Sequence, residues 1–291
     1  MRSVRKAVIP AAGRGIRFYP ATKTIPKEML TVVDKPVIQY VVGEAVDSGF
    51  TDVLFVTRER ENIIESHFNH NEELAKLLVQ QPEKDLLKDV RHLSQMISMS
   101  SVVQSKPLGL GHAIQITEPF LEGEPFGVLL GDEIIISGVP CMRQLIKVYE
   151  TYGTSVVAVQ KVDEHLVSNY GVILGEPVGE KEDRIFRIID MVEKPSREAA
   201  PSNLAIVGRY ILTPTVFQTL KGLSPGTGGE IQLTDGIRAL LKEETVHACL
   251  LEGSRHDVGS KLGYLIANVE CALARKDLGF DFRNYLKKLR L

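Results

Sequence analysis

Residues Ala7–Pro20 read AVIPAAGRGIRFYP, a short apolar run followed by a glycine-rich loop. The run Ala7–Ile9 predicts a buried strand. Gly13 and Gly15 allow the backbone of the loop to approach a ligand closely, and successive backbone N–H groups there can bind an anion. The first 27 residues carry seven Lys or Arg side chains and no Asp or Glu. A glycine-rich turn ringed by cations suits a polyphosphate, so this stretch predicts a nucleotide site at the end of the first strand.

The loop differs from the two commonest phosphate-binding patterns. The pattern G-x-x-x-x-G-K-[ST] is absent from the chain. In the dinucleotide-binding pattern G-x-G-x-x-G, Phe18 stands where the third glycine is needed. We therefore set aside a flavin or nicotinamide enzyme. By itself the loop is equally compatible with a surface turn that carries scattered basic residues, and the rest of the chain must decide between the two interpretations.

The bulk composition is that of a globular protein. Of the 291 residues, 44% are hydrophobic and 25% are charged, and the net charge is −2, so the chain can bury a sizeable core. A nearly neutral chain offers no basic field, and we expect neither nucleic acid nor a membrane as a partner. Cys141, Cys249 and Cys271 have no C-x-x-C spacing, which argues against a zinc site or a disulfide framework. Without a signal-peptide core or an apolar run of membrane-helix length, we expect cytoplasmic localisation.

Apolar runs typical of buried strands alternate with helical patterns in the first half of the chain. The expected strands are Ala7–Ile9, Val53–Val56, Ser101–Gln104, Gly127–Leu130 and Ser155–Val159. The expected helices are Val37–Ser48 and Met142–Tyr152, and each lies close behind a proline that suits a helix start. This alternation indicates βαβ units and a mainly parallel sheet.

The second half is richer in strand patterns. They occur at Gly171–Leu174, Ile185–Met191 and Leu204–Leu212, without full helices between them. We expect a mixed sheet region there, which covers one side of a cleft. Two further segments have helical patterns: residues 70–99 predict a helical insertion, and Lys261–Leu291 predicts a helical tail. In the tail, core spacing is shown by Leu265, Val269, Ala272 and Leu273.

Three loops are expected to meet at one edge of the sheet, because ligands of open α/β sheets bind beyond the carboxyl ends of the strands. They are the loop Ala11–Lys27, the loop after Gln104 and the loop that contains Asp132. Each carries residues suited to one part of a nucleotide.

Several blocks of the chain match, in order, the pattern of one family. The N-terminal block comprises Ala11–Lys23 and Ile25–Leu30. The later blocks are Gln104 with Pro107–Ala113, Leu130–Asp132, Tyr170–Ile173, Val192–Pro195, Ser202–Tyr210, Glu230–Asp235 and His256–Tyr264. With these blocks the chain resembles the sugar-1-phosphate nucleotidyltransferases, and among them the bacterial uridylyltransferases. The resemblance spans nearly the whole chain, and colinear blocks are far more specific than one glycine-rich loop.

The resemblance implies a Rossmann-like, three-layer α/β fold with a mixed, mainly parallel central sheet and a helical C-terminal tail. It implies that UTP and α-D-glucose 1-phosphate react to give UDP-glucose and pyrophosphate, with Mg²⁺ as cofactor, in a homodimer or homotetramer. Within a single domain, 1–291, residues 1–160 are expected to form mainly the nucleotide-binding half and residues 161–258 the sugar-phosphate-binding half. Residues 259–291 form the tail, which is compatible with an oligomer contact or with a cap on the domain.

On the nucleotide side, the resemblance implies that Arg17 contacts the β- and γ-phosphates and that Lys27 reaches the α-phosphate region. These two are the expected catalytic residues. Nucleotide contacts are also expected from Ala11, Ala12, Gly13, Gly15, Gln104 and Gly109. Of these, Gln104 and Gly109 are expected to read the uracil edge. Outside such a motif, Lys and Arg side chains are usually solvated surface charges.

The resemblance pairs Asp132 with Asp257 as ligands of Mg²⁺, which binds carboxylates together with substrate phosphates. From the residues alone, each carboxylate has a structural alternative. Asp132 suits a helix or turn cap, and Asp257 suits a cap of the helix after Gly259. Glu133 is expected to be solvated or to support the metal ligands from behind.

On the sugar side, the resemblance implies that Glu193 accepts hydrogen bonds from glucose hydroxyls and that Lys194 pairs with the sugar phosphate. Gly171 allows close approach of the hexose. For Asp235 and His112 we expect helix-start or packing roles.

Two positions depart from the family pattern, and two alternative functions remain open. Arg14 replaces a frequent Leu, and Ile16 replaces a common Thr and so removes a hydroxyl that can bond a phosphate. One alternative is a thymidylyltransferase of the same fold that uses dTTP, because a single methyl group is worth only about 1–3 kcal/mol in an apolar pocket. The other is a non-catalytic subunit that senses nucleotides or sugar phosphates, which the presence of every expected charged residue disfavours.

Overall fold

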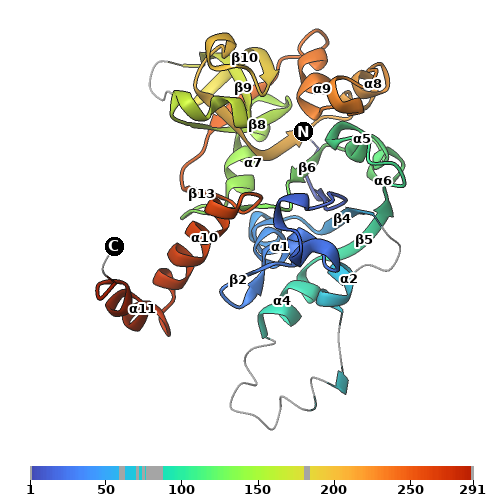
Figure 1. Ribbon diagram of the computed structural model, residues 1–291. Helices are drawn as coiled ribbons and strands as arrows, with labels where there is room; N and C mark the ends of the chain where they lie inside the picture. The colour runs from blue at the N-terminus through green and yellow to red at the C-terminus, as the bar shows by residue number, and fades with distance from the viewer. Residues whose placement is uncertain are drawn as a thin grey trace.

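The computed structural model describes residues 2–58, 63–69, 72–73, 76, 88–179 and 184–289. Its main sheet contains the strands β1 (Lys6–Pro10), β4 (Asp52–Thr57), β5 (Ser98–Val103), β6 (Phe126–Leu129), β8 (Val156–Lys161), β9 (Gly171–Pro177), β10 (Ile185–Glu193), β11 (Leu204–Leu212) and β12 (His247–Leu250). Over the described residues these nine strands lie in the order β5-β4-β1-β6-β11-β8-β12-β10-β9 (Figure 1). Two antiparallel ribbons are formed by β2 (Thr31–Val32) with β3 (Lys35–Pro36) and by β7 (Glu133–Ile136) with β13 (Ser254–Asp257).

Parallel pairing is concentrated in one half of the main sheet. β1 runs parallel to β4 and β6, and β4 runs parallel to β5. β11 enters between β6 and β8 and is antiparallel to both, and β10 is antiparallel to β9 and β12. The sheet is therefore mixed, as the sequence predicts, but continuous parallel pairing is confined to β5-β4-β1-β6, with one further parallel pair formed by β8 and β12. Because β11 comes late in the chain, both halves of the sequence share one sheet.

The described helices are α1 (Val37–Ser48), α2 (Ile63–Phe68), α4 (Lys88–Met96), α5 (Leu110–Gln115), α6 (Glu118–Leu121), α7 (Cys141–Tyr152), α8 (Val216–Lys221), α9 (Leu233–Leu240), α10 (Lys261–Ala274) and α11 (Gly279–Leu286). The predicted helices Val37–Ser48 and Met142–Tyr152 are confirmed as α1 and as most of α7. Both helices end at a glycine in the left-handed conformation, Gly49 with φ 94° and Gly153 with φ 71°. This is a common way to satisfy the last carbonyl groups of a helix. Short 3₁₀ turns lie at Ile16–Phe18, Ala21–Lys23, Lys27–Met29, Glu164–Asn169, Arg197–Ala199 and Thr227–Gly229.

Side-chain alternation along β1 separates two hydrophobic cores. Ala7 and Ile9 pack with residues of α1 and α7, whereas Val8 packs with residues of α5, α8 and α9. All three side chains are fully buried. Because successive side chains of a strand point to opposite faces, helices must cover both faces of the sheet. This is the predicted three-layer arrangement.

The tail forms α10 and α11, which lead away from the sheet in Figure 1. Its helical character is confirmed, but the predicted apolar face is not the one that packs. Leu265 is 61% exposed, whereas Ala267 and Cys271 are buried. The physical reason is that Ala267 and Cys271 pack in a small cluster with Val32, Val37, Ile134 and Val258, which covers a narrow line of small side chains on α10.

Three other predictions concern single segments or residues. Of the helical insertion predicted at 70–99, residues 70–71, 74–75 and 77–87 lie outside the described residues, and α4 forms a helix near its end. The cysteines are free thiols, and all three are buried. Within the described ranges, no helix has the length and apolar character needed to cross a membrane.

Candidate active site

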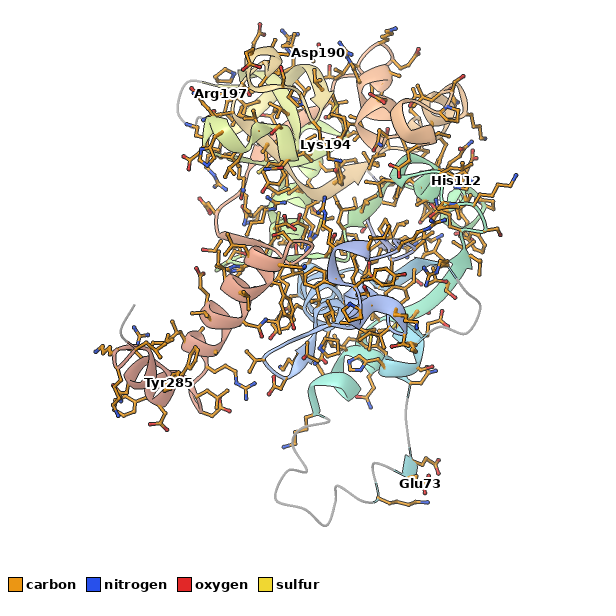
Figure 2. The ribbon with its side chains drawn as sticks, in the orientation of Figure 1. Glu73, His112, Asp190, Lys194, Arg197 and Tyr285 are labelled. Carbon is orange, nitrogen blue, oxygen red and sulfur yellow. The ribbon has the colours of Figure 1, made fainter. Side chains whose placement is uncertain are left out.

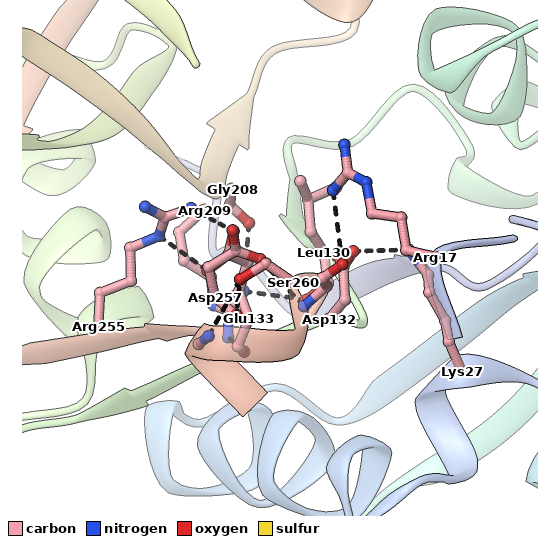
Figure 3. A network of polar contacts seen from close by, with 12 residues as sticks. Arg17, Lys27, Leu130, Asp132, Glu133, Gly208, Arg209, Arg255, Asp257 and Ser260 are labelled. Atoms are coloured by element: carbon pink, nitrogen blue, oxygen red, sulfur yellow. Dashed lines mark hydrogen bonds and ion pairs between the residues drawn. The ribbon is translucent and has the colours of Figure 1, made fainter. Parts of the chain in front are cut away.

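An ion pair between two distant segments lies at the centre of the candidate site. Lys27 ends the glycine-rich loop, and its Nζ lies 2.6 Å from Oδ2 of Asp132, just beyond β6 (Figure 3). The same Nζ lies 3.9 Å from Oε1 of Glu28. Burial by itself lowers the pKa of Lys27, but the charges of Asp132 and Glu28 more than offset it, so the pKa is raised. Burial raises the pKa of Asp132, and Lys27 reverses this effect, so that both groups are charged.

The two glycines of the loop lie directly against Lys27. A Cβ atom on Gly13 would lie 3.4 Å from Cε of Lys27, and one on Gly15 would lie 3.3 Å from its Cβ. Gly15 has φ 60°, a left-handed conformation that favours glycine, and its carbonyl oxygen accepts a hydrogen bond from Oγ1 of Thr22 at 2.7 Å. The loop therefore wraps around the lysine side chain, which explains why small residues occur at both positions.

The remaining residues of the loop differ in exposure. Ala11 is buried and donates its N–H to a carbonyl oxygen of β4 at 2.8 Å, while Ala12 is partly buried against the core. Arg17 is exposed, and its Nη1 lies 3.4 Å from the carbonyl oxygen of Gly259. Ile16 is 65% exposed, which is unusual for an isoleucine.

A second carboxylate lies beside Asp132. Asp257 ends β13, its Oδ1 accepts the N–H of Gly259 at 2.9 Å, and the N–H of Val258 donates to the carbonyl oxygen of Asp132 at 3.1 Å. A Cβ atom on Gly259 would lie 2.7 Å from Oδ2 of Asp132 and 3.1 Å from Oδ1 of Asp257. The two carboxylates thus face one point. Ser260, not Asp257, caps α10, because its Oγ accepts an N–H of the first helical turn at 3.1 Å.

Glu133 lies behind these carboxylates and is not solvated. Its side chain is 8% exposed and forms two hydrogen bonds with Arg255, one of them from Nε to Oε2 at 2.7 Å. The guanidinium of Arg255 lies 4.6 Å from the centre of the Tyr170 ring. The alternative of a solvated Glu133 is therefore wrong, and its support of the expected metal ligands stays a prediction. Sequence reasoning missed Arg255, although its place two residues before Asp257 on one strand puts both side chains on the same face.

Gln104, Gly109 and His112 form one unit at the end of β5. Nε2 of Gln104 donates to the carbonyl oxygen of Gly109 at 3.0 Å and lies 3.0 Å from Nδ1 of His112. Burial lowers the pKa of His112, which favours the neutral ring that can accept this bond. Gly109 has φ 91°, and a Cβ atom there would lie 2.8 Å from the carbonyl oxygen of Ile231. His112, which is labelled in Figure 2, therefore orients Gln104, a role beyond the packing expected from the sequence.

The sugar-side residues meet where β9 begins and β10 ends. Gly171 lies opposite Glu193 in the register of the two strands, and a Cβ atom on Gly171 would lie 3.0 Å from Oε2 of Glu193. That same oxygen accepts a hydrogen bond from Oγ1 of Thr234 at 2.6 Å, a contact that sequence reasoning missed. Nζ of Lys194, a residue labelled in Figure 2, lies 3.1 Å from Oε1 of Glu193. Asp235 is exposed in the first turn of α9, which agrees with the expected helix-start position and not with packing.

Glu28 is a buried carboxylate that the sequence did not single out. It is 1% exposed, and neither of its carboxylate oxygens has a hydrogen-bond partner within the described part of the chain. Burial raises its pKa to about 7, an effect that the nearby Lys27 only partly opposes. No group of three or more His, Cys, Asp or Glu side chains suited to a metal occurs among the described residues. The candidate cation ligands are therefore the pair Asp132 and Asp257.

Comparison with known proteins identifies the family. The nucleotidyl transferase family model matches residues 6–272, which is most of the chain. The chain belongs to the nucleotidyl transferase family. This nucleotidyl transferase is 46% identical over 286 residues to the UTP–glucose-1-phosphate uridylyltransferase of Bacillus subtilis, covering 98% of this chain and 95% of the relative.

Solved structures agree with the predicted fold. A UDP-glucose pyrophosphorylase in complex with UDP-glucose has a TM-score of 0.87 and 41% identity, over 94% of this chain and 100% of the other. A UTP-bound UGPase from Acinetobacter baumannii has a TM-score of 0.89 and 39% identity, over 99% of this chain and 100% of the other. A glucose-1-phosphate thymidylyltransferase from Bacillus anthracis, described as putative, has a TM-score of 0.68 and 26% identity over 94% of this nucleotidyl transferase and 96% of its own chain. The dTTP alternative is thus represented by a more distant relative.

Proposed function

We propose that this nucleotidyl transferase is a UTP–glucose-1-phosphate uridylyltransferase, which converts UTP and α-D-glucose 1-phosphate to UDP-glucose and pyrophosphate. One observation carries the proposal. Lys27, from the glycine-rich loop, lies 2.6 Å from Asp132, and Asp132 faces the same point as Asp257. Three segments that are distant in the sequence thus bring a cation and two carboxylates together, in a chain whose full-length relatives carry the name of this activity.

In this reaction, an oxygen of the sugar phosphate attacks the α-phosphorus in line, and the bond from that phosphorus to the pyrophosphate oxygen breaks. The nucleophile is already an anionic oxygen, so no base has to remove a proton. The protein must instead offset the repulsion between anions and stabilise the charge that develops. We assign Arg17 to the β- and γ-phosphates and Lys27 to the α-phosphate, to which its ammonium would move from Asp132.

Asp132 and Asp257 would hold the divalent cation, which we infer to be Mg²⁺. The fit rests on the donor set, because two carboxylates that face one point offer the oxygen ligands that a hard cation requires. Mg²⁺ usually keeps waters and binds one or two carboxylates together with substrate phosphates. When bound, it would supply positive charge against the phosphate oxygens.

The base and the sugar meet different ends of the cleft in this proposal. Nε2 of Gln104 is engaged by Gly109 and His112, which leaves its oxygen to accept from N3–H of uracil. Gly109 offers its backbone to the same edge. Glu193 accepts from glucose hydroxyls, and Lys194 pairs with the sugar phosphate.

The division of labour along the chain follows from these assignments. We assign residues 1–160 mainly to the nucleotide, residues 161–258 to the sugar phosphate and residues 259–291 to a tail with an oligomer contact. Leu262 and Phe280, which are 69% and 76% exposed, support such a contact in a homodimer or homotetramer. The buried free thiols support a reducing compartment, the cytoplasm.

The test is pyrophosphate release with Mg²⁺ from UTP, dTTP, CTP, ATP or GTP, each with and without glucose 1-phosphate. We expect release only when UTP and the sugar phosphate are both present. Faster release with dTTP would move the enzyme to the thymidylyltransferases. A folded protein that binds UTP but releases no pyrophosphate would instead be a sensing subunit.

A further inference from the structure

The block Ser202–Tyr210 matches the family pattern but has no role in the site described so far. It forms β11, whose register against β8 shifts between Ile206, opposite Val159, and Tyr210, opposite Val157. Three residues of β11, Val207 to Arg209, therefore lie opposite the single residue Ala158 of β8, which is a β-bulge. Gly208 lies inside the bulge with φ 69°. Bulges next to active sites often redirect a side chain, and the side chain at issue here is that of Arg209.

Arg209 is fully buried and bonds the main chain on both sides of Asp132. Its Nη1 donates to the carbonyl oxygen of Leu130 at 3.2 Å, and its Nη2 donates to the carbonyl oxygen of Glu133 at 2.7 Å (Figure 3). These two residues flank the dipeptide that ends in the candidate cation ligand. Gly208 adds a third hydrogen bond between β11 and this loop, because its carbonyl oxygen accepts the N–H of Leu130 at 3.0 Å.

The guanidinium of Arg209 is held in place by an ion pair with Glu44. Its Nε and Nη2 donate to Oε2 of Glu44 on α1 at 3.0 and 2.8 Å, and Oε1 of Glu44 accepts the N–H of Met142 at 3.1 Å. A buried ion pair often contributes little net stability, because desolvation offsets the attraction. Its geometry is nevertheless demanding, since only a planar guanidinium can bond Glu44 and two carbonyl oxygens at once.

We propose that Arg209 is a positioning residue for nucleotidyl transfer, which fixes the main chain around Asp132 and thereby holds its carboxylate opposite Asp257. This inference rests on the proposed function, because it takes these carboxylates to be the cation ligands. Arg209 touches neither substrate nor cation and acts only through the loop between β6 and β7.

The decisive experiment measures Mn²⁺ binding by electron paramagnetic resonance, with UTP present and glucose 1-phosphate absent. For Arg209→Lys we expect Mn²⁺ affinity to fall about tenfold or more, because an ammonium with three donors cannot replace the four directed hydrogen bonds to Glu44, Leu130 and Glu133. At saturating Mg²⁺, the KM for glucose 1-phosphate should change less than about twofold. In the Asp132→Asn background, adding Arg209→Lys should cause no further loss of Mn²⁺ affinity, because both changes act on one ligand.

Two further variants separate positioning from stability. Leu220→Ala removes a fully buried side chain of α8, far along the chain from the cation loop, and should lower the melting temperature with Mn²⁺ affinity unchanged. If Arg209→Lys fails to fold, Glu44→Gln replaces it, and a several-fold loss of Mn²⁺ affinity is expected because the anchor of the guanidinium is weakened.

Three outcomes would count against these ideas in different ways. Mn²⁺ affinity within twofold of wild type in the folded variants, or an equal loss in the Asp132→Asn background, would overturn the role of Arg209. Mn²⁺ binding that Asp132→Asn leaves unchanged would overturn both the cation site and this role. Wild-type protein that binds Mn²⁺ in an Arg209-dependent way but releases no pyrophosphate when UTP and glucose 1-phosphate are both present would overturn the proposed reaction, while supporting the role of Arg209 in positioning Asp132.

Discussion

The two lysines assigned to phosphates, Lys27 and Lys194, lie in contrasting surroundings. The side chain of Lys27 is 22% exposed, is covered by the glycine-rich loop and is paired with Asp132 at 2.6 Å. The side chain of Lys194 is 54% exposed and lies 3.1 Å from Glu193. The first lysine is held by packing and charge, and the second is accessible to solvent.

The backbone of Lys194 compensates for this openness. Its φ of 45° is in the left-handed region, which is uncommon for residues other than glycine, and its N–H donates to the carbonyl oxygen of Tyr170 at 3.0 Å. Strained conformations of this kind persist where the surroundings over-determine them, often at functional sites. The contrast teaches that the side proposed for the nucleotide is organised by buried charge, and the side proposed for the sugar phosphate by a constrained turn.

The largest expected effect comes from disrupting the buried ion pair of Lys27 and Asp132. Asp132→Asn keeps the shape of the side chain but removes the charge that pairs with Lys27 and would bind the cation. We expect kcat to fall about 10³-fold or more, measured as pyrophosphate release at saturating substrates. Asp47→Asn, an exposed change on α1, is the matched control and should have no effect. Turnover near the wild-type value in Asp132→Asn would refute the assignment.

At the solvent-accessible lysine, Lys194→Ala should weaken sugar-phosphate binding and leave nucleotide binding unchanged. We expect the KM for glucose 1-phosphate to rise about 10- to 100-fold, while UTP affinity, measured by calorimetry, stays within about twofold of wild type. Lys161→Ala, at the exposed end of β8, serves as the control. A comparable loss of UTP affinity would show that the two sides are not separate.

A third prediction concerns which base the proposed nucleotide site prefers, uracil or thymine. Because the Gln104 unit is preformed, uracil and thymine are distinguished only by how well the pocket tolerates one methyl group. We expect kcat/KM for UTP to exceed that for dTTP by about tenfold, measured with glucose 1-phosphate as co-substrate. An equal or higher value for dTTP would contradict this expectation.

The smallest effect concerns Glu28, whose pKa is raised to about 7 by burial. A carboxyl group whose pKa is higher in the folded state contributes stability at low pH and loses that contribution as the pH rises through 7. From pH 6 to pH 8, this group should cost wild type about 1 kcal/mol of unfolding free energy, a loss that Glu28→Gln avoids.

Urea unfolding of the cation-free protein at several pH values would measure this difference. Glu150→Gln, an exposed change on α7, should track wild type at every pH. If the unfolding free energies of wild type and Glu28→Gln differ by a constant amount from pH 6 to pH 8, Glu28 does not titrate in this range.

Local sequence patterns predicted many of the strands and helices of the fold. Leu204–Leu212 was predicted as a strand and forms β11, and Val37–Ser48 was predicted as a helix and forms α1. The periodicity of side chains is a local property, so the sequence reports it directly. It does not report which strands pair, and the insertion of β11 between β6 and β8 could not be read from it.

The candidate site divides in the same way. The glycine-rich loop with Lys27, together with Asp132 and Asp257, was found because these residues lie in recognisable blocks. Their supports were missed because each depends on a distant partner. Arg209 is 165 residues from Glu44 along the chain, and Arg255 is 122 residues from Glu133.

The sequence by itself determined the family, the residue types of the site and the position of most strands and helices, because these properties are written in local order and composition. Only the tertiary structure decided which charges are buried, which are paired and which backbone groups they hold. The physical reason is that the pKa of Glu28, the ion pair of Lys27 and the anchoring of Arg209 arise from desolvation and from contacts across the sheet. Both the desolvation and these contacts arise only when the chain has folded.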